Sequence, residues 1–365
     1  MSYSKRKIRV MVVDDSAVMR KMIPRLLEND DEIEVVATAL DGDFAIMKIE
    51  QVKPDVVTLD IDMPRMDGIT ALRHIVAEYA IPVLMLSSLT TEGAALTLKA
   101  LQMGAVDFIC KPASADRIGE MAAELIAKIK AAARSQVVEL SHLESGDSTA
   151  KANGSWPVAR GGSRKIVAIG ASSGGPNALR FLLPKIPCDL GAGIVIVQHM
   201  PEKFTEMLAR WLDDICELEV REARDGDLII PGRALIAPGH AHLKVKRTPH
   251  GTVAEVERRE PVSGHMPSVD VLFRSVAAEY GANAVAIIMT GMGSDGAAGI
   301  GEVQRAGGMT VAQDKESCTI FGMPRAAIDR GCIDKIVPLV DMASYLISTV
   351  GRSVNKEVMS DAGSN

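Results

Sequence analysis

Short apolar segments that alternate with amphipathic ones most constrain the fold of this chain. Ile8 to Val13 is apolar and β-branched, and similar segments follow at 33–38, 56–59, 83–86 and 107–110. Such strands are typical of parallel sheets buried under helices. Helical patterns lie between them at 16–28 and 42–51, and a closing helix is predicted at 114–134. Pro24 is expected to kink or interrupt the first helix. The alternation predicts an α/β class and a five-stranded parallel, doubly wound sheet.

The composition changes between residues 135 and 163, where Ser, Gly, Asp and Asn are crowded together as in a flexible linker. Strand and helix patterns resume at residue 164 and predict a second α/β domain, mainly parallel, with an antiparallel insertion. We therefore expect an N-terminal domain over 1–134, a linker over 135–163, a second domain over 164–352 and a polar tail over 353–365.

The overall composition limits the possible partners. The net charge of -6 gives no basic surface for nucleic acid, and the five scattered Cys, without a Cys-x-x-Cys, argue against disulfides or zinc. No apolar run is long enough to cross a bilayer, and the polar segment Met1 to Lys7 does not resemble a signal peptide. These features predict a cytoplasmic protein that neither inserts into membranes nor binds nucleic acid.

Five polar side chains stand at the ends of the strands predicted in the first domain. They are Asp14, Asp15, Asp60, Ser87 and Lys111. The carboxyl ends of parallel strands meet at one edge of a sheet, where ligands bind. Three carboxylates suit Mg²⁺, while a lysine and a hydroxyl suit phosphate oxygens. The set therefore predicts that Asp60 accepts a phosphoryl group.

Each of these residues also has a simpler interpretation. Asp14 and Asp15 could cap the following helix, and Lys111-Pro112 could form a turn. Asp60-Ile61-Asp62 resembles the Asp-x-Asp nucleophile motif of phosphatases, but that motif belongs on a first strand rather than a third. The combination at five strand ends is more specific than any member, and it favours the phospho-acceptor.

A Gly-x-Ser-x-Gly turn centred on Ser172 opens the second domain, between a predicted strand at 166–169 and a predicted helix at 176–183. This is the pattern of a nucleophile elbow, in which small neighbours expose the serine hydroxyl. A dinucleotide-binding fingerprint would need glycine at position 172. A purely structural glycine-rich turn remains possible from this segment alone.

Two further strand ends supply partners for a nucleophilic serine. His199 follows a predicted strand at 194–197, and Asp295 follows another at 285–289. His199 could take the proton of Ser172 while Asp295 orients His199, although Asp295 could also be a helix cap. The order Ser, His, Asp differs from the Ser, Asp, His order of α/β-hydrolases, which argues against that fold but not against the chemistry.

The remaining histidines point less clearly to a site. His240 and His242 alternate as on a strand edge, so we expect them to be solvated rather than metal-binding. His265 lies in a loop before a predicted helix, where it either lines a site or caps the helix.

The first domain resembles a response-regulator receiver domain. The matching segments are 12–16, 59–64 and 66–68, with Ser87 and Lys111-Pro112. The resemblance implies that a histidine kinase phosphorylates Asp60, that Asp14 and Asp15 hold Mg²⁺ with Asp60, that Lys111 contacts the phosphate, and that Ser87 moves to report it.

Almost the whole chain, from about residue 7 to 350, resembles the chemotaxis protein-glutamate methylesterases, or CheB-type response regulators. The matching motifs are 170–172, 198–201, 267–270, 290–293, 295–296 and 321–324. The resemblance implies Ser172 as nucleophile, His199 as base, Asp295 as orienting residue, and the Met292 backbone N–H in the oxyanion hole.

The resemblance also implies the reaction and its control. The second domain would hydrolyse glutamate γ-methyl esters on chemoreceptors and deamidate glutamines, without a metal in the esterase chemistry, and phosphorylation of Asp60 would activate it. A docking module with an idle triad is one alternative. A transcriptional effector is another, but the chain has no helix-turn-helix pattern and no basic stripe.

Overall fold

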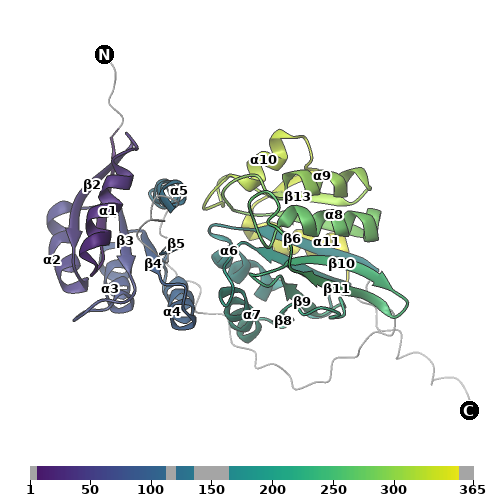
Figure 1. Cartoon of the computed structure of the whole chain (residues 1–365). Coiled ribbons are helices and arrows are strands. Elements are labelled where there is room, and N and C mark those ends of the chain that lie inside the picture. Colours follow the sequence, from purple (N-terminus) through teal and green to yellow (C-terminus); the bar gives the residue numbers. More distant parts are fainter. Residues whose placement is uncertain (1–5, 112–120, 135–163, 353–365) are drawn as a thin grey trace, which may run out of the picture. The chain divides into compact units, whose positions relative to one another are not determined.

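The computed structural model describes residues 6–111, 121–134 and 164–352, which belong to two compact units divided between Asp147 and Ser148 (Figure 1). The predicted linker at 135–163, the predicted tail at 353–365 and residues 114–120 of the predicted closing helix lie outside the described residues.

The first unit is a five-stranded parallel sheet in the order β2-β1-β3-β4-β5, which confirms the predicted fold class. Its strands are β1 (Ile8–Val13), β2 (Ile33–Ala39), β3 (Val56–Asp60), β4 (Val83–Ser87) and β5 (Asp107–Cys110). Its helices are α1 (Ala17–Leu27), α2 (Gly42–Val52), α3 (Gly68–His74) continued by a π-helical turn (Ile75–Tyr79), α4 (Thr91–Gln102) and α5 (Ala122–Ala132).

Helices cover both faces of this sheet. Helices α1 and α5 share one hydrophobic core with alternate residues of the strands, among them Val10, Val12 and Leu84, while α2, α3 and α4 pack side by side on the other face. Side-chain caps begin four of the helices, at Ser16, Asp41, Asp67 and Thr90.

Pro24 does not interrupt α1, contrary to one expectation from the sequence. The helix runs from Ala17 to Leu27, and the N–H of Glu28 donates to the carbonyl of Pro24 at 2.9 Å. Proline removes one hydrogen bond from a helix interior. Here the burial of Ile23 and Leu27 in the core on either side of the proline keeps the last turn helical.

The second unit is built on a seven-stranded sheet in the order β14-β13-β12-β6-β7-β9-β8, with every pair parallel. The strands are β6 (Lys165–Ala171), β7 (Ala192–Gln198), β8 (Glu219–Glu222), β9 (Arg233–Ile236), β12 (Ala284–Ile288), β13 (Met309–Gln313) and β14 (Lys335–Val337). An antiparallel pair, β10 (His242–Thr248) and β11 (Gly251–Glu257), confirms the expected insertion.

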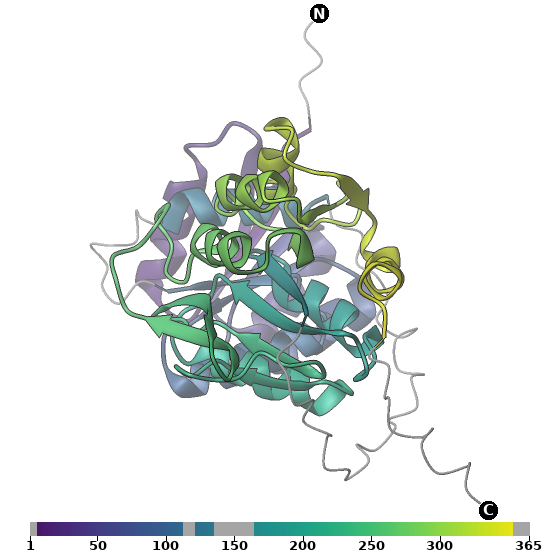
Figure 2. The same ribbon diagram turned by 90° about the vertical axis from the view of Figure 1, so that its right-hand side faces the viewer.

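Helices again cover both faces of the sheet. Helices α8 (Val269–Tyr280), α9 (Ala297–Arg305) and α10 (Met323–Asp329) enclose the larger core together with β10 and β11. The green helices α8 and α9 lie side by side in both views (Figures 1 and 2). The opposite face carries α6 (Gly175–Leu182), α7 (Phe204–Ile215) and α11 (Leu339–Val350), with a short 3₁₀ turn at Leu183–Lys185 after α6. A second 3₁₀ turn, Gly281–Asn283, follows α8.

The strand order of each sheet marks the place for a site. In the first sheet, β1 lies between β2 and β3; in the second, β6 lies between β7 and β12. The connections leave in opposite directions at these points, which opens a crevice beyond the carboxyl ends of the strands. None of the helices formed by the described residues is long and apolar enough to span a membrane.

Candidate functional site

The crevice of the first sheet contains three carboxylates and one cation. Asp14 and Asp60 are buried, Asp15 is exposed, and one oxygen of each lies within 4.8 Å of the others. The Lys111 Nζ is 2.9 Å from Asp14 Oδ2 and 2.7 Å from Asp60 Oδ2. The strand ends therefore bring these four predicted residues together.

The charges at this crevice are not balanced. Burial raises the pKa of Asp60 to about 6; Lys111 opposes the rise, and the carboxylates of Asp14 and Asp15 add to it. Burial alone would lower the pKa of Lys111, but Asp60 and Asp14 outweigh it and raise that pKa. Three carboxylates around one ammonium form an oxygen donor set that fits a hard divalent cation.

Ser87, the fifth predicted residue of this site, is engaged by the start of α4. Its Oγ is 3.2 Å from the carbonyl oxygen of Gly93 and 2.5 Å from Thr97 Oγ1. The Lys111 N–H donates to the Ser87 carbonyl at 2.7 Å, but within the described ranges no hydrogen bond joins the Ser87 hydroxyl to Asp60 or to Lys111. The hydroxyl is therefore held by α4 and not by the acidic cluster.

Ser172 stands on a tight turn between β6 and α6. Its N–H donates to the carbonyl of Thr290 at 3.0 Å, and its own carbonyl accepts from Gln198 Nε2 at 2.8 Å. Glycine is required two residues to either side of Ser172: a Cβ at Gly170 would lie 2.2 Å from Val269, and Gly174 has a φ of 75°. These are the small neighbours that a nucleophile elbow needs.

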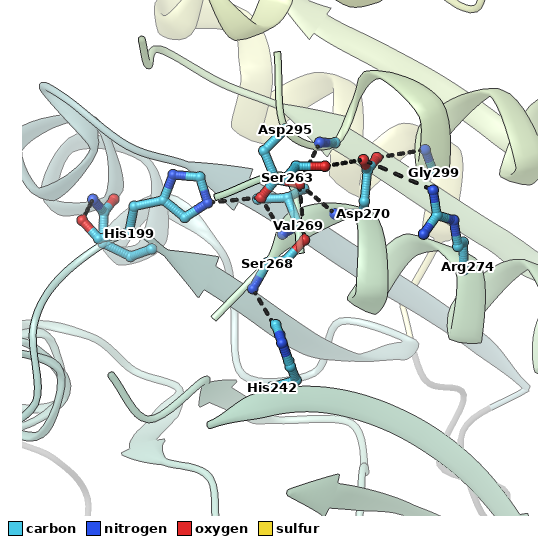
Figure 3. Close-up of polar contacts among 11 residues, drawn as sticks. His199, His242, Ser263, Ser268, Val269, Asp270, Arg274, Asp295 and Gly299 are labelled. Atoms are coloured by element: carbon cyan, nitrogen blue, oxygen red, sulfur yellow. Dashed lines mark hydrogen bonds and ion pairs between the residues drawn. The ribbon is translucent and has the colours of Figure 1, made fainter. Parts of the chain in front are cut away.

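His199 and Asp295 form a buried pair beside this turn (Figure 3). His199 Nε2 lies 2.8 Å from Asp295 Oδ2. His199 follows Gln198, which is in register with Ala171, so His199 and Ser172 leave adjacent strands side by side. His199 Nδ1 is buried and has no hydrogen-bond partner in the part of the chain that the structure describes.

The backbone around α8 satisfies the remaining acceptor positions of Asp295. Oδ2 accepts from the N–H of Val269 at 2.7 Å, while Oδ1 accepts from Ser268 Oγ at 2.8 Å and from the N–H of Asp270 at 3.1 Å (Figure 3). Burial would raise the pKa of Asp295, but the bonds from His199, Val269 and Ser268 outweigh it and lower the pKa. Asp295 therefore stays ionised beside His199.

Asp295 and Asp270 exchange caps between two helices. Asp295 precedes α9 yet accepts from the first N–H groups of α8, and Asp270, in the first turn of α8, accepts from the N–H of Gly299 in α9 at 2.7 Å (Figure 3). A carboxylate is stabilised at a helix N-terminus, where N–H groups lack partners within the helix. The alternative interpretation of Asp295 as a helix cap is therefore partly correct. Asp295 caps α8, however, and not α9, the helix that follows it in the sequence.

His242 is buried, so the expectation that it is solvated is wrong. The N–H of Ser268 donates to His242 Nδ1 at 3.2 Å, which leaves the proton on Nε2, 3.1 Å from the carbonyl of Glu260. The neutral ring holds Ser268 in place under Asp295 (Figure 3). Ser268 belongs to the matching segment 267–270, but its contacts with His242 and Asp295 could not be predicted, since they depend on the tertiary fold. The side chain of His240 is 41% exposed, in line with the expectation that it is solvated.

His265 lies at the site rather than at a helix cap. Its ring stacks on that of His199, with centroids 4.0 Å apart and planes 7° from parallel. Of the two roles that the sequence left open, the structure supports lining the site.

Met292 lies on the loop after β12, next to Ser172. A Cβ at the preceding Gly291 would lie 2.7 Å from Ser172 Cβ, and one at Gly322 would lie 2.6 Å from the Gly291 carbonyl. No acceptor for the Met292 N–H occurs among residues 164–352.

The fold and the two crevices define the class: a response regulator whose receiver-type sheet is joined to an α/β unit carrying a serine, a histidine and an aspartate. Residues 10–123 match the response regulator receiver domain family, and residues 167–346 match the CheB methylesterase family.

Whole-length relatives agree with these matches. The chain is 51% identical over 350 residues to a protein-glutamate methylesterase/protein-glutamine glutaminase of Koribacter versatilis, with 93% of this chain and 95% of the relative covered. It is 44% identical to the Pyrococcus horikoshii protein of that name, with 94% of each chain covered. A crystal structure of the Thermotoga maritima CheB methylesterase catalytic domain matches with a TM-score of 0.50 and 40% identity, covering 51% of this chain and 98% of that one. This chain belongs to the CheB methylesterase family.

Proposed function

We propose that this chain is a phosphorylation-regulated protein-glutamate methylesterase and protein-glutamine glutaminase that acts on chemoreceptors during chemotactic adaptation. The ionised Asp295, 2.8 Å from His199 beside the Ser172 turn, carries the proposal. The names of the relatives support the same activity.

In the proposed reaction, Ser172 Oγ attacks the γ-carbonyl of a glutamate methyl ester. His199 takes the proton through Nδ1, because Nε2 is held by Asp295. The protonated ring then gives the proton to departing methanol, which leaves an acyl-enzyme. Water, deprotonated by the same nitrogen, releases the glutamate carboxylate. Attack on a glutamine follows the same steps, with ammonia as the leaving group.

Two features stabilise the charges that develop along this path. Asp295 remains an anion because backbone N–H groups support it, so it stabilises the imidazolium that forms on His199. The Met292 N–H donates to the oxyanion of the tetrahedral intermediate. Donors that are fixed in advance are worth about 10²–10³ in rate for each one removed.

The receiver supplies the proposed control. Asp60 accepts the phosphoryl group, and Asp14, Asp15 and Asp60 hold Mg²⁺, which when bound neutralises negative charge on the carboxylates and phosphate. Lys111 contacts a phosphate oxygen, and Ser87 leaves Gly93 and Thr97 to contact another. This exchange shifts the receiver's population towards the state that releases catalytic activity.

The proposed domains and partners follow from the same assignment. Residues 1–134 form the receiver and 164–352 the catalytic domain, with a linker at 135–163 and a tail at 353–365. A chemotaxis histidine kinase is the phosphodonor, and the substrates are cytoplasmic segments of methyl-accepting receptors. The chain acts in the cytoplasm and needs neither nucleic acid nor insertion into a membrane.

Methanol release from methylated receptor fragments tests both halves of the proposal. We expect the full chain to release methanol faster with a small phosphodonor and Mg²⁺ than without them. Ser172→Ala should abolish release, and Asp60→Asn should keep a basal rate that no longer responds to the donor. Release by Ser172→Ala would contradict the nucleophile assignment, and a donor response in Asp60→Asn would contradict the switch.

The role of the Met292 backbone needs a different pair of variants. Gly322→Ala places a Cβ against the Gly291 carbonyl and displaces the loop, so we expect kcat to fall about 10²-fold. Met292→Ala keeps the N–H and should change kcat by less than about threefold. Equal losses in the two variants would indicate a role for the Met292 side chain instead.

A further inference from the structure

The segment between β11 and α8 contains a tight two-residue turn. Val262 and His265 exchange two backbone hydrogen bonds of 3.0 Å, and the residues between them have positive φ angles, 54° at Ser263 and 78° at Gly264. Two central residues with positive φ are the mark of a type I′ hairpin turn. Such a turn fixes the direction in which the side chain of His265 leaves the backbone.

The turn is tied to the helix start that holds Asp295. Ser263 Oγ donates to Asp270 Oδ2 at 3.2 Å, and Asp270 Oδ1 accepts from the N–H of Gly299 (Figure 3). A serine at positive φ costs about 1 kcal/mol or more, and this bond offsets part of that cost. The turn that carries His265 and the carboxylate of Asp295 are thus both hydrogen-bonded to the start of α8.

The ring of His199 needs a second contact to fix its plane, because only one hydrogen bond from a described residue holds it. The bond from Nε2 to Asp295 fixes one corner of the imidazole, while Nδ1 has no partner among the described residues. A single bond at a corner leaves the ring plane free to tip. The parallel ring of His265, 4.0 Å away, covers one face and opposes that motion.

We propose that His265 is a positioning residue of the hydrolase site: its stacked ring sets the plane of His199 so that Nδ1 faces Ser172. The inference rests on the proposed function and extends it to a residue outside the triad. Stacked ring pairs contribute about 0.5–1.5 kcal/mol, and misplacing a catalytic group by about 1 Å can cost 10²-fold in rate. The role requires a flat ring at position 265, not a titrating nitrogen.

The experiment compares variants of the full chain that keep or remove the ring. A fluorophosphonate probe that phosphonylates Ser172 reports proton removal by His199 without a receptor substrate. We expect His265→Ala to lower the maximal labelling rate about 10- to 100-fold, with the probe concentration for half-maximal rate unchanged. His265→Phe restores a flat ring and should label within about threefold of the wild type. The control is His250→Ala, in the exposed turn between β10 and β11, which should match the wild type.

Each other result overturns the inference. Equal losses in His265→Phe and His265→Ala would assign the effect to the imidazole nitrogens, and a wild-type rate in His265→Ala would leave the ring without a role. A wild-type chain that is not labelled at Ser172 would overturn both the triad and this inference. Labelling without methanol release from receptor fragments would overturn only the substrate assignment, because the variant comparison does not depend on the receptor.

Discussion

Each unit has a buried aspartate at or beyond the carboxyl end of one of its strands, and the pKa values of the two move in opposite directions. Asp60 ends β3 and is 4% exposed; Asp295 follows β12 and is 2% exposed. The pKa of Asp60 rises to about 6, whereas that of Asp295 falls below its ordinary value. Burial opposes ionisation at both, so the difference comes from the neighbours.

The neighbours show what each site is built for. Asp60 has one ammonium, shared with Asp14, and further carboxylates that disfavour its charge. Asp295 has backbone N–H groups, a serine hydroxyl and an imidazole. The carboxylates of the receiver therefore carry an excess of negative charge that a divalent cation would balance, whereas the charge of Asp295 is already supported by the folded protein.

Among the substitutions that test the difference between the two aspartates, Asp295→Asn should have the largest effect on activity. It removes the anion that orients His199 and stabilises its charged form, so we expect kcat for methanol release to fall about 10³- to 10⁴-fold. Asp334→Asn is the control, because Asp334 also accepts hydrogen bonds, from Thr310, but it lies at the amino end of β14, whereas Ser172 follows the carboxyl end of the parallel strand β6. A similar loss in Asp334→Asn would mean that reduced stability explains both.

Stability should change with opposite signs in Asp60→Asn and Asp295→Asn. The folded pKa of Asp60, about 6, exceeds its unfolded value of 3.8, so its ionisation destabilises the fold above pH 6. Without Mg²⁺ at pH 7.5, Asp60→Asn should raise the free energy of unfolding by about 1–3 kcal/mol, and the gain should fade as the pH drops from 6 to 4. Asp295→Asn should lose about 2–4 kcal/mol, because its amide nitrogen cannot accept the buried N–H bonds.

Chemical denaturation of the full chain at a series of pH values measures both changes. A loss of stability in Asp60→Asn at pH 7.5 would show that Lys111 outweighs burial at Asp60, and would remove the contrast between the two aspartates.

Mg²⁺ should stabilise the receiver and leave the stability of the second unit unchanged. At a concentration ten times its dissociation constant, it should add about 1.4 kcal/mol to the unfolding free energy of the receiver. Asp15→Asn should weaken this response, and EDTA should reverse it. Asp295→Asn should respond to Mg²⁺ as the wild type does; a lost response there would place a cation site outside the receiver.

The smallest effect on activity is expected from a substitution of Thr97, whose hydroxyl in α4 donates a hydrogen bond to the hydroxyl of Ser87. Thr97→Val removes one hydroxyl and should lower the cost of moving Ser87 by about 1 kcal/mol, or about fivefold in the switch equilibrium. The concentration of phosphodonor that half-activates methanol release should fall accordingly. Thr90→Val, which alters the cap of the same helix without touching Ser87, is the control.

The sequence could predict the site residues that stand at the ends of parallel strands, because these ends meet at one edge of a sheet. Parallel strands place Asp14, Asp60 and Lys111 at one edge, and the same rule brings Ser172 close to His199. Strand β8 (Glu219–Glu222) escaped prediction because three of its four side chains are charged. In β11, small and charged residues likewise conceal the strand pattern.

The supporting residues of the site could not be predicted in the same way. His242 and Ser268 meet only because the β10–β11 pair folds back over α8. The stack of His265 on His199 depends on the turn at Ser263-Gly264. These two residues indicate a turn in the sequence, but they do not indicate which ring His265 will contact. Contacts between loops from distant segments follow from the packed core, which strand and helix patterns do not specify.

The exchange of caps between Asp295 and Asp270 has a consequence for protein engineering. Each helix start is completed by a side chain from the other, so neither loop is an independent module. A designer who transplanted the loop after β12 into another scaffold would carry over the aspartate without the amides that keep it charged. The smallest portable form of this site is the two crossed helix starts together, and recombination between homologues should tolerate breakpoints outside 268–299 better than within it.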